Sequence, residues 1–302
     1  MASRLLKDED KMKLLVSLNN KTLDDYLKYT NSFIIGLKDY SINYIEFTLS
    51  EIKELLEKNN KIELFVSINK NIFNDEIIEL EKVLIELNKL PIKGLLFYDL
   101  AVLSIVKRLN LNIPLCWHQT HMVTNYNTCN YYFNKGCKYA YLSSEITGNE
   151  MDEISNNSDI SLMALFMGHP IVSHSKRNLL SNYFINYKYE KEEKDYLIKS
   201  NNSENYYIKE ASNGTSIIYG NIVNGSKYVL NLRNKIDYGI LDEQYIEHDL
   251  FLEILSLYKK LNEELDINKQ EEYLLKIETL IGNDTGFFDK KTIYKVKRNE
   301  KN

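Results

Sequence analysis

The hydrophobic pattern of residues 94–119 indicates the repeating unit of the fold. Residues 94–99 (GLLFYD) predict a buried strand, residues 100–110 a helix, and residues 113–119 (IPLCWHQ) a second strand. Two strands that are joined by a helix of roughly a dozen residues cannot form a hairpin, so we expect them to lie parallel in one sheet. Both strands end in polar residues, which indicates where a site would lie.

The same alternation of strands and helices extends through most of the chain. Seven strands are predicted up to residue 168, and an eighth, residues 238–242 (YGILD), follows about 70 residues later. Eight such units are what an eight-stranded parallel barrel requires, so we predict an α/β, TIM-like barrel. An open, doubly wound sheet is the alternative, because the first strand is short. The other predicted strands are 14–18, 33–37, 62–69, 139–145 and 161–168, and the other helices begin at Thr22 or cover 49–58, 75–90, 124–135, 146–156 and 248–265.

Residues 184–235 interrupt this rhythm. They contain short runs rich in Tyr and Ile (NYYIKE, TSIIYG, KYVLNL), separated by Asn, Ser and Gly. We expect a small antiparallel insertion here, between the seventh and eighth units of a barrel domain at 1–265. Residues 266–302 predict a charged helix and a tail, in which Phe287 and Phe288 pack back onto the barrel and the last basic residues are mobile.

Composition limits the class of protein. The 302 residues are 44% hydrophobic, which is enough for a large core, and no run of about 18 apolar residues is present to span a membrane. The first residues lack an apolar segment typical of export signals. Three cysteines without CxxC spacing indicate reduced thiols in a cytoplasm. A net charge of −5 provides no general attraction to nucleic acid, so an RNA contact would need a local basic patch.

Polar side chains at the strand ends are the candidate site, because the loops that follow the strands of a parallel barrel share one face. Carboxylates, imidazoles and cations that converge on one mouth would bind and polarise an anionic or polar substrate. The candidates are Lys38, Asn69, Asp99, His118, Gln119, His121, Ser144, Glu145 and Asp242, with His174, Ser175, Lys176 and Arg177 just beyond the seventh strand.

Metal binding and nucleophilic catalysis are two possible functions of these residues, and each has a simpler structural alternative. His118 and His121 are either half of a metal site, completed by another histidine (His169 or His174), or residues that cap a turn. Ser175 follows a histidine, but no GxSxG turn is present for a serine nucleophile. Cys116 lies in mid-strand, where packing is its expected role, and no basic neighbour indicates a thiolate.

A guanidinium after the seventh strand suits an anion. Arg177 can bind a carboxylate or phosphate through two hydrogen bonds, although a surface ion pair is the alternative. The 23 tyrosines could provide stacking surfaces for bases, but residues spread along the whole chain more often serve packing.

The sequence resembles the collagenase-like peptidase family (peptidase family U-thirty-two). The resemblance rests on GLLFYDLAVLSIVKRLNLNIPLCW, TNYNTCNYYFNKGCKYAYLSSEIT, SHSKRNLLSNYF and DTGFFDKKTIYKVK, which occur in the expected order over nearly the whole chain. It is strongest to the short members of the family, which in Gram-positive bacteria pair with a longer relative. The resemblance implies a barrel fold, in agreement with the strand pattern.

The resemblance also bears on cofactors. Better-understood relatives act in oxygen-independent or prephenate-dependent hydroxylation of the tRNA wobble uridine, of a ribosomal cytidine or of ubiquinone precursors, often with four cysteines that hold an iron–sulfur cluster. Here Ile171 and Asn178 stand at two of the cysteine positions, and the stretch after Tyr183 (YKYEKEEKDY) replaces the second pair. We therefore expect no cluster and no metal in this chain, with prephenate as a candidate co-substrate.

Four positions match the family pattern: Asn125, Glu145, Arg177 and Asp242. The leading hypothesis is a cytoplasmic component of tRNA wobble-uridine hydroxylation that acts with a longer paralogue. Arg177 would hold an anionic group, while Glu145 and Asp242 would position or deprotonate the acceptor. tRNA and a small anionic metabolite are the expected ligands. A peptidase and a non-catalytic scaffold for the paralogue are the alternatives.

Overall fold

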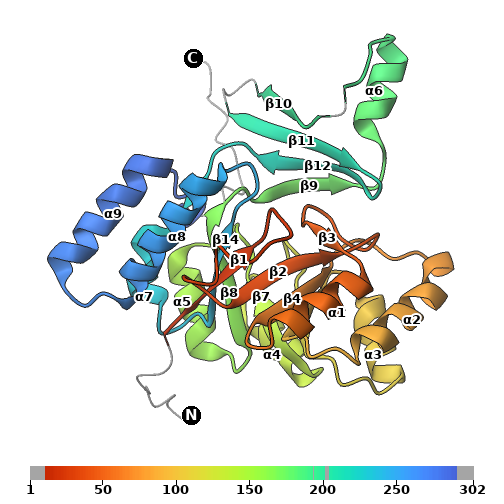
Figure 1. Cartoon of the computed structure of the whole chain (residues 1–302), viewed down its shortest axis with the longest axis horizontal. Helices are drawn as coiled ribbons and strands as arrows, with labels where there is room; N and C mark the ends of the chain where they lie inside the picture. The colour runs from red at the N-terminus through yellow and green to blue at the C-terminus, as the bar shows by residue number, and fades with distance from the viewer. Residues whose placement is uncertain (1–10, 193, 201–203, 291–302) are drawn as a thin grey trace, which may run out of the picture.

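Eight parallel strands form a closed barrel at the centre of the molecule (Figure 1). The computed structural model describes residues 11–192, 194–200 and 204–290. Each strand pairs in parallel with the next, and the first strand also pairs with the last, Leu15 opposite Ile240, which closes the ring. This confirms the predicted TIM-like barrel over an open sheet. In order around the ring, the strands are β1 (Lys13–Ser17), β2 (Ser32–Leu37), β4 (Glu63–Ile68), β5 (Gly94–Phe97), β6 (Leu115–Trp117), β7 (Cys137–Tyr141), β8 (Ser161–Gly168) and β14 (Tyr238–Asp242).

Helices cover the outside of the barrel, and most of them begin where the hydrophobic pattern predicts. Two begin with a capping box, in which Thr48 and Thr147 accept a hydrogen bond from the backbone N–H of a glutamate three residues later. The elements are α1 (Leu49–Lys58), the 3₁₀ turn η1 (Asn74–Glu76), α2 (Ile77–Leu87), α3 (Leu100–Arg108), α4 (Tyr126–Asn134), α5 (Gly148–Asn157), α7 (Ser226–Leu232), α8 (His248–Glu263) and α9 (Ile267–Ile281), with short strands β3 (Glu46–Phe47) and β13 (Val223–Asn224) beside the barrel.

The helix expected after Thr22 does not form, and this prediction was wrong. Residues 24–29 are a series of turns. The backbone N–H groups of Tyr26 and Leu27 both bond to the carbonyl of Leu23, and those of Tyr29 and Thr30 both bond to the carbonyl of Tyr26. Each pair of hydrogen bonds thus ends on one buried residue, Leu23 or Tyr26. No continuous series of helical hydrogen bonds develops between β1 and β2.

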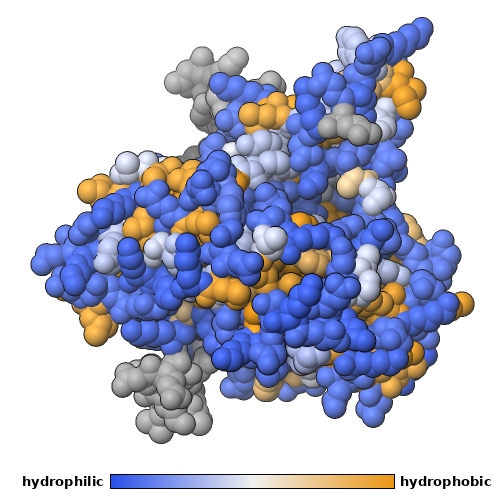
Figure 2. Space-filling model, in the orientation of Figure 1, coloured by the Kyte–Doolittle hydropathy of each residue, from blue (hydrophilic) through white to orange (hydrophobic). Residues whose placement is uncertain are grey.

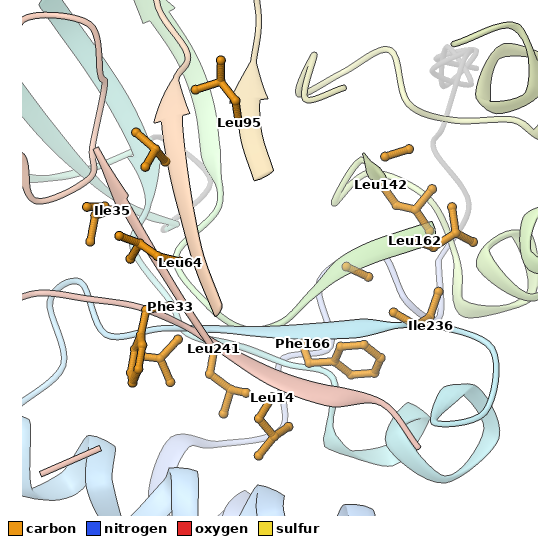
Figure 3. Packing of buried hydrophobic residues seen from close by; sticks show 14 of the residues in the cluster. Leu14, Phe33, Ile35, Leu64, Leu95, Leu142, Leu162, Phe166, Ile236 and Leu241 are labelled. Atoms are coloured by element: carbon orange, nitrogen blue, oxygen red, sulfur yellow. The ribbon is translucent and has the colours of Figure 1, made fainter. Parts of the chain in front are cut away.

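Side chains of the barrel strands alternate between its interior and its helix-covered exterior. In β1 and β2, Leu15 and Ile34 belong to the interior cluster, whereas Leu14, Phe33 and Ile35 belong to the exterior one. Figure 3 shows exterior residues of neighbouring strands, among them Leu14, Phe33 and Leu241, pointing to the same side of the sheet. This period of two determines which residues face the inside of the mouth. The interior cluster contains Leu15, Ile34, Phe65, Leu96, Cys116, Tyr139, Met163, Leu165, Tyr238 and Ile240.

A small antiparallel sheet lies between the seventh and eighth barrel strands, as predicted. In Figure 1 it lies above the barrel, and α6 projects away from it. NYYIKE and TSIIYG form strands of this sheet, but KYVLNL forms α7, so the expectation of a strand there was wrong. Its buried Val229 and Leu232 are three residues apart, which suits a helix that packs by one face. The sheet has the order β10 (Tyr196–Lys199), β11 (Asn205–Ala211), β12 (Gly214–Tyr219) and β9 (Ile171–Ser175), with α6 (Leu179–Tyr187) between β9 and β10.

The proposed insertion range, 184–235, overlaps β10 to β12 and also includes α7.

After α9 the chain returns to the barrel. Phe288 is buried against Phe166 and Tyr228, whereas Phe287 is 40% exposed. The expected mobile basic residues, 291–302, lie outside the described residues.

The face in Figure 2 is mainly hydrophilic, with scattered apolar patches. No helix among the described residues is long and apolar enough to cross a membrane.

Candidate functional site

A narrow cavity lies at the mouth of the barrel, where the carboxyl ends of the strands meet. It offers about 60 Å³ of space, and by the same measure a water molecule needs about 10–15 Å³. The cavity therefore suits a small ligand or part of one. Its walls come from β1, β7, β8, β9 and β14 and from the loops beside them. The lining residues are Ser17, Asn43, Tyr44, His118, Thr120, Tyr141, Leu142, Ser144, Leu165, His169, Pro170, Ile171, Ile240, Asp242 and Gln244.

Asp242 provides the carboxylate of this cavity. It is the last residue of β14, two positions after the inward-facing Ile240, so strand alternation points it into the mouth. Enclosure by protein raises its pKa from 3.8 to about 6, although hydrogen bonds from the Ser17 side chain and the Gln244 N–H oppose the increase. A carboxyl group with this pKa can hold or release a proton near neutral pH.

His118 lies across the cavity at the end of β6. Its ring stacks on the ring of Tyr141, with 4.3 Å between centroids and 12° between planes. Burial lowers the pKa of His118 to about 4, so the imidazole is neutral at pH 7. Its Nδ1 is buried without a hydrogen-bond partner.

His169 also lines this cavity, and the sequence indicated it only as a candidate metal ligand. Its Nδ1 lies 2.8 Å from the carbonyl oxygen of Tyr219, and its Nε2 is buried without a partner. Burial lowers the pKa of His169, which favours the neutral ring. The preceding Gly168 has φ +139°, and a Cβ atom there would lie 2.6 Å from Cβ of Asp242. Glycine thus permits the close approach of β8 to β14 beside the cavity.

Two further hollows adjoin the cavity and extend between the barrel mouth and the antiparallel sheet. One, of about 210 Å³, shares Thr120 and Ile171 with the cavity, and the other, of about 310 Å³, shares Asn43 and Tyr44. The amide of Asn213, at the tip of the sheet, donates to the carbonyl of Ser41 on the barrel (2.8 Å). Together, the cavity and the two hollows form one groove, and Asp242 forms part of its wall.

Four predicted site residues serve to hold the backbone at the mouth. Asn69 exchanges hydrogen bonds with both backbone groups of Ile42 (2.7 and 3.1 Å). Asp99 caps α3, and Asn125 caps α4. Gln119 donates to the carbonyl of Tyr98 (2.8 Å). These side chains fix the loops that carry the site, and only Asn69 also lines one of the hollows.

Glu145 lies at the outer rim. Its carboxylate is 3.1 Å from Nδ1 of His121, and both side chains are nearly half exposed. Its backbone N–H donates to the hydroxyl of Ser143. Glu145 and His121 thus form a pair of their own, and neither lines the cavity with Asp242, although Ser144 does.

Ser175 is the last residue of β9 in the antiparallel sheet, and Lys176 and Arg177 follow it. Lys176 lies 3.3 Å from the carboxylate of Glu76 and above the ring of Phe73, so it ties the sheet to the barrel. Ser175 accepts a hydrogen bond from the N–H of Arg177 (3.2 Å). Arg177 is exposed and lines neither the cavity nor the adjoining hollows. The structure therefore groups Asp242 with His118 and places these three residues at the end of β9, beside the antiparallel sheet.

The groups weighed for nucleophilic or metal chemistry have other surroundings. Burial raises the pKa of Cys129 and Cys137 to about 12, and it also raises that of Cys116, which disfavours thiolates. Both ring nitrogens of His174 are engaged, by Ser216 and by the carbonyl of Asn213. Among the described residues, no three His, Cys, Asp or Glu side chains form a metal-binding group. Ile171 and Asn178, the two residues that the resemblance aligns with cluster cysteines, are the first residue of β9 and the residue before α6.

The fold and site define a TIM-like β/α barrel with its groove at the carboxyl ends of the strands. A family model described as Peptidase family U32 matches residues 10–281, so the chain belongs to this family.

Two curated relatives come from Bacillus subtilis (strain 168). The chain is 27% identical to "tRNA hydroxylation protein P2" over 288 residues, which cover 87% of this chain and 92% of that protein. It is 24% identical to "tRNA hydroxylation protein P1" over 157 residues, 51% of this chain and 37% of that protein. Among solved structures, the U32 peptidase Mk0906 aligns with a TM-score of 0.44 and 10% identity over 55% of this chain and 73% of that one.

Proposed function

We propose that this chain is a cytoplasmic component of tRNA wobble-uridine hydroxylation that acts with a longer paralogue. Support comes from the similarity to tRNA hydroxylation protein P2, which extends over most of both chains. The similarity to P1 uses 157 residues but only 37% of that protein, so P1 is longer than this chain. A P1-like protein is therefore the partner that we propose.

The observation that carries this proposal is the position of Asp242. It lines a small cavity together with His118 and His169, and enclosure raises its pKa to about 6. Such a group can take up or deliver a proton on a polar ring that enters the mouth. A cavity of about 60 Å³ at the reacting group suits part of one nucleotide.

Two further residues have proposed roles outside the cavity. Arg177, exposed on the insertion, would bind an anionic group, either an RNA phosphate or the carboxylate of a small metabolite such as prephenate. Glu145, paired with His121 at the rim, would position the acceptor nucleotide. These roles place substrate contacts outside the groove, at the barrel rim and beside the antiparallel sheet.

We assign the redox step to the paralogue. Hydroxylation replaces C–H by C–OH and removes two electrons from the base, so it requires an oxidant. Ile171 and Asn178, at positions where relatives have cluster cysteines, offer no thiolate. The role of this chain is then to bind the substrate and to hold a proton at Asp242.

A peptidase is the second candidate, because the family carries that description. The raised pKa values of the three cysteines and the engaged ring of His174 disfavour the nucleophiles that such an activity would use. A scaffold without substrate contacts is the third, and it predicts that no change in the groove affects hydroxylation while the complex remains intact.

Mass spectrometry of nucleosides from total tRNA tests the proposal. Deletion of the gene should abolish 5-hydroxyuridine and its derivatives, and the intact gene should restore them. Arg177→Ala should restore at most about a tenth, since a charge-assisted contact contributes roughly 1.5–3 kcal/mol. Arg108→Ala, which removes an exposed ion pair with Glu81 on the barrel exterior, is the matched control. Unchanged nucleosides in the deletion strain, with no second pathway present, would contradict the proposal.

A further inference from the structure

Unpartnered polar atoms are concentrated in the mouth cavity. Among the described residues, five buried side-chain nitrogen or oxygen atoms lack a hydrogen bond, and three of them belong to residues that line this cavity: Asn43 Nδ2, His118 Nδ1 and His169 Nε2. Folded proteins leave few such groups, because each one costs about 1–3 kcal/mol. Their concentration around one cavity indicates a ligand that satisfies them.

The protonation of His169 shows what it can accept. The Tyr219 carbonyl oxygen can only accept a hydrogen bond, so its partner at 2.8 Å, the ring Nδ1, must be the donor. The proton of the neutral ring therefore lies on Nδ1. In the neutral ring, which burial favours, Nε2 then has a lone pair and no hydrogen. This atom therefore requires a donor from the ligand.

Asn43 supplies the opposite polarity. It has φ +59°, a left-handed conformation that asparagine tolerates, and this holds its side chain at the cavity wall. Its unpartnered Nδ2 is a donor and requires an acceptor from the ligand. His118 lacks a hydrogen bond at Nδ1 and can take either tautomer, so it can match a donor or an acceptor. The stacked rings of His118 and Tyr141 add a flat wall.

A ligand that fits this pattern has an N–H donor next to a carbonyl acceptor on a small flat ring. We propose that the mouth cavity recognises the imide edge of a uracil base, with the N3–H donating to His169 Nε2 and a flanking carbonyl accepting from Asn43 Nδ2. Cytosine is disfavoured, because its N3 is an acceptor and would face the lone pair of His169. This inference rests on the proposed function and makes His169 and Asn43 its specificity-determining residues.

The test uses the purified complex of this chain with its longer paralogue and three anticodon stem–loop RNAs. These carry uridine, 3-methyluridine or cytidine at the wobble position, and affinities are measured by fluorescence anisotropy. The wild-type complex should bind the uridine RNA roughly 5- to 10-fold more tightly than the other two, which is the effect of one lost buried hydrogen bond.

Two variants probe the recognition itself. His169→Asn keeps a donor for the Tyr219 carbonyl but removes the ring acceptor, and Asn43→Asp replaces the donor with an acceptor. His169→Asn should bind the three RNAs with equal affinity, and Asn43→Asp should bind the uridine RNA at least about 5-fold more weakly than the wild type does, because its carboxylate opposes the flanking carbonyl of the base. The melting temperatures of both variants and their yield of complex should match the wild type. His248→Asn, a histidine on α8 outside the groove, is the matched control and should keep the preference for uridine.

Equal binding of the three RNAs by the wild type, an unchanged preference in His169→Asn, or a loss of preference in His248→Asn would each overturn the inference. The nucleoside measurement separates the two proposals. If deletion abolishes hydroxyuridine but the wild-type complex does not discriminate, only the recognition of the base fails. If deletion has no effect, the proposed function itself fails.

Discussion

At the residue scale, Asp242 sits beside a second carboxylate with a different environment. Glu243 is 1% exposed and accepts hydrogen bonds from the hydroxyl of Tyr26 and from Nδ1 of His248 (2.6 Å). The bond to Glu243 is the main reason why the pKa of His248 is raised. The negative charge of Glu243 in turn adds to the raised pKa of Asp242. Adjacent residues thus point to opposite faces of the strand end, one satisfied within the protein and one facing the cavity.

The raised pKa of Asp242 predicts a pH-dependent stability difference. The folded protein holds this carboxyl at a pKa of about 6 instead of 3.8, so its contribution to stability is complete below pH 3.8 and is lost as the pH rises through 6. Asp242→Asn cannot ionise and should be more stable than the wild type at pH 8. Two pKa units correspond to at most about 3 kcal/mol, and partial exposure to the cavity reduces this to roughly 1–2 kcal/mol.

Urea unfolding of both proteins from pH 4 to pH 8 measures this difference. The variant should lose its advantage as the pH approaches 4. A wild type that is as stable as the variant at pH 8, or a difference that does not change with pH, would show that the pKa of Asp242 is not raised in the folded protein.

At the element scale, the antiparallel sheet depends on the turn between β11 and β12. Gly214 has φ +118°, and a Cβ atom there would lie 2.1 Å from the carbonyl oxygen of Ser175 on β9. Gly214→Ala should therefore separate β12 from β9, at a cost on the order of 2 kcal/mol or more for this sheet. Gly136→Ala is the matched control, because Gly136 also has positive φ but no neighbour within 4 Å.

Hydrogen exchange resolved by residue distinguishes these outcomes. In Gly214→Ala, amides of β9 to β12 should exchange at least about tenfold faster, while those of the barrel strands keep their rates. Gly136→Ala should cost only about 1 kcal/mol and leave the sheet unchanged. An unchanged sheet in Gly214→Ala would contradict the role of this close approach.

Elements with a strong hydrophobic period could be predicted, and short ones could not. β8 and β14 begin and end where the pattern places them, because each is an apolar run bounded by polar residues or glycine. The run KYVLNL is too short for its hydrophobic pattern to distinguish a strand from a helix. It forms the helix α7 because of its packing on α8 and β8. The turns after Thr22 depend on two buried anchors, which no local pattern reveals.

The residues of the candidate site also divide into those that could be predicted from the sequence and those that could not. The inward position of His118 and Asp242 follows from strand alternation, so both could be predicted. His169 could not, because it follows a glycine that leaves the regular strand, and its significance depends on the distant carbonyl of Tyr219. Arg177 was expected at the barrel mouth, but β9 belongs to the antiparallel sheet and leads the chain away from the mouth. The chain returns to the mouth only at Tyr219, 42 residues after Arg177.

At the scale of the whole molecule, the chain is a closed barrel whose mouth is roofed by the insertion. Asn213 and Lys176 tie this roof to the barrel through Ser41 and Glu76. The groove between them joins the cavity of Asp242 to two larger hollows. In the proposed complex, a nucleotide places its base in the cavity and a phosphate near Arg177, an exposed cation that can attract it despite the net charge of −5.

The most direct test of this account is the hydroxyuridine content of tRNA in a deletion strain complemented with Asp242→Asn. The amide keeps the size of the carboxyl group but cannot exchange a proton, and Asp249→Asn, on the exposed face of α8, is the control. We predict that Asp249→Asn restores the wild-type content and that Asp242→Asn, at equal protein abundance and with the paralogue still bound, restores less than about a hundredth, in line with the loss of a general acid–base group. Full restoration by Asp242→Asn would contradict the central claim that the mouth cavity takes part in the reaction.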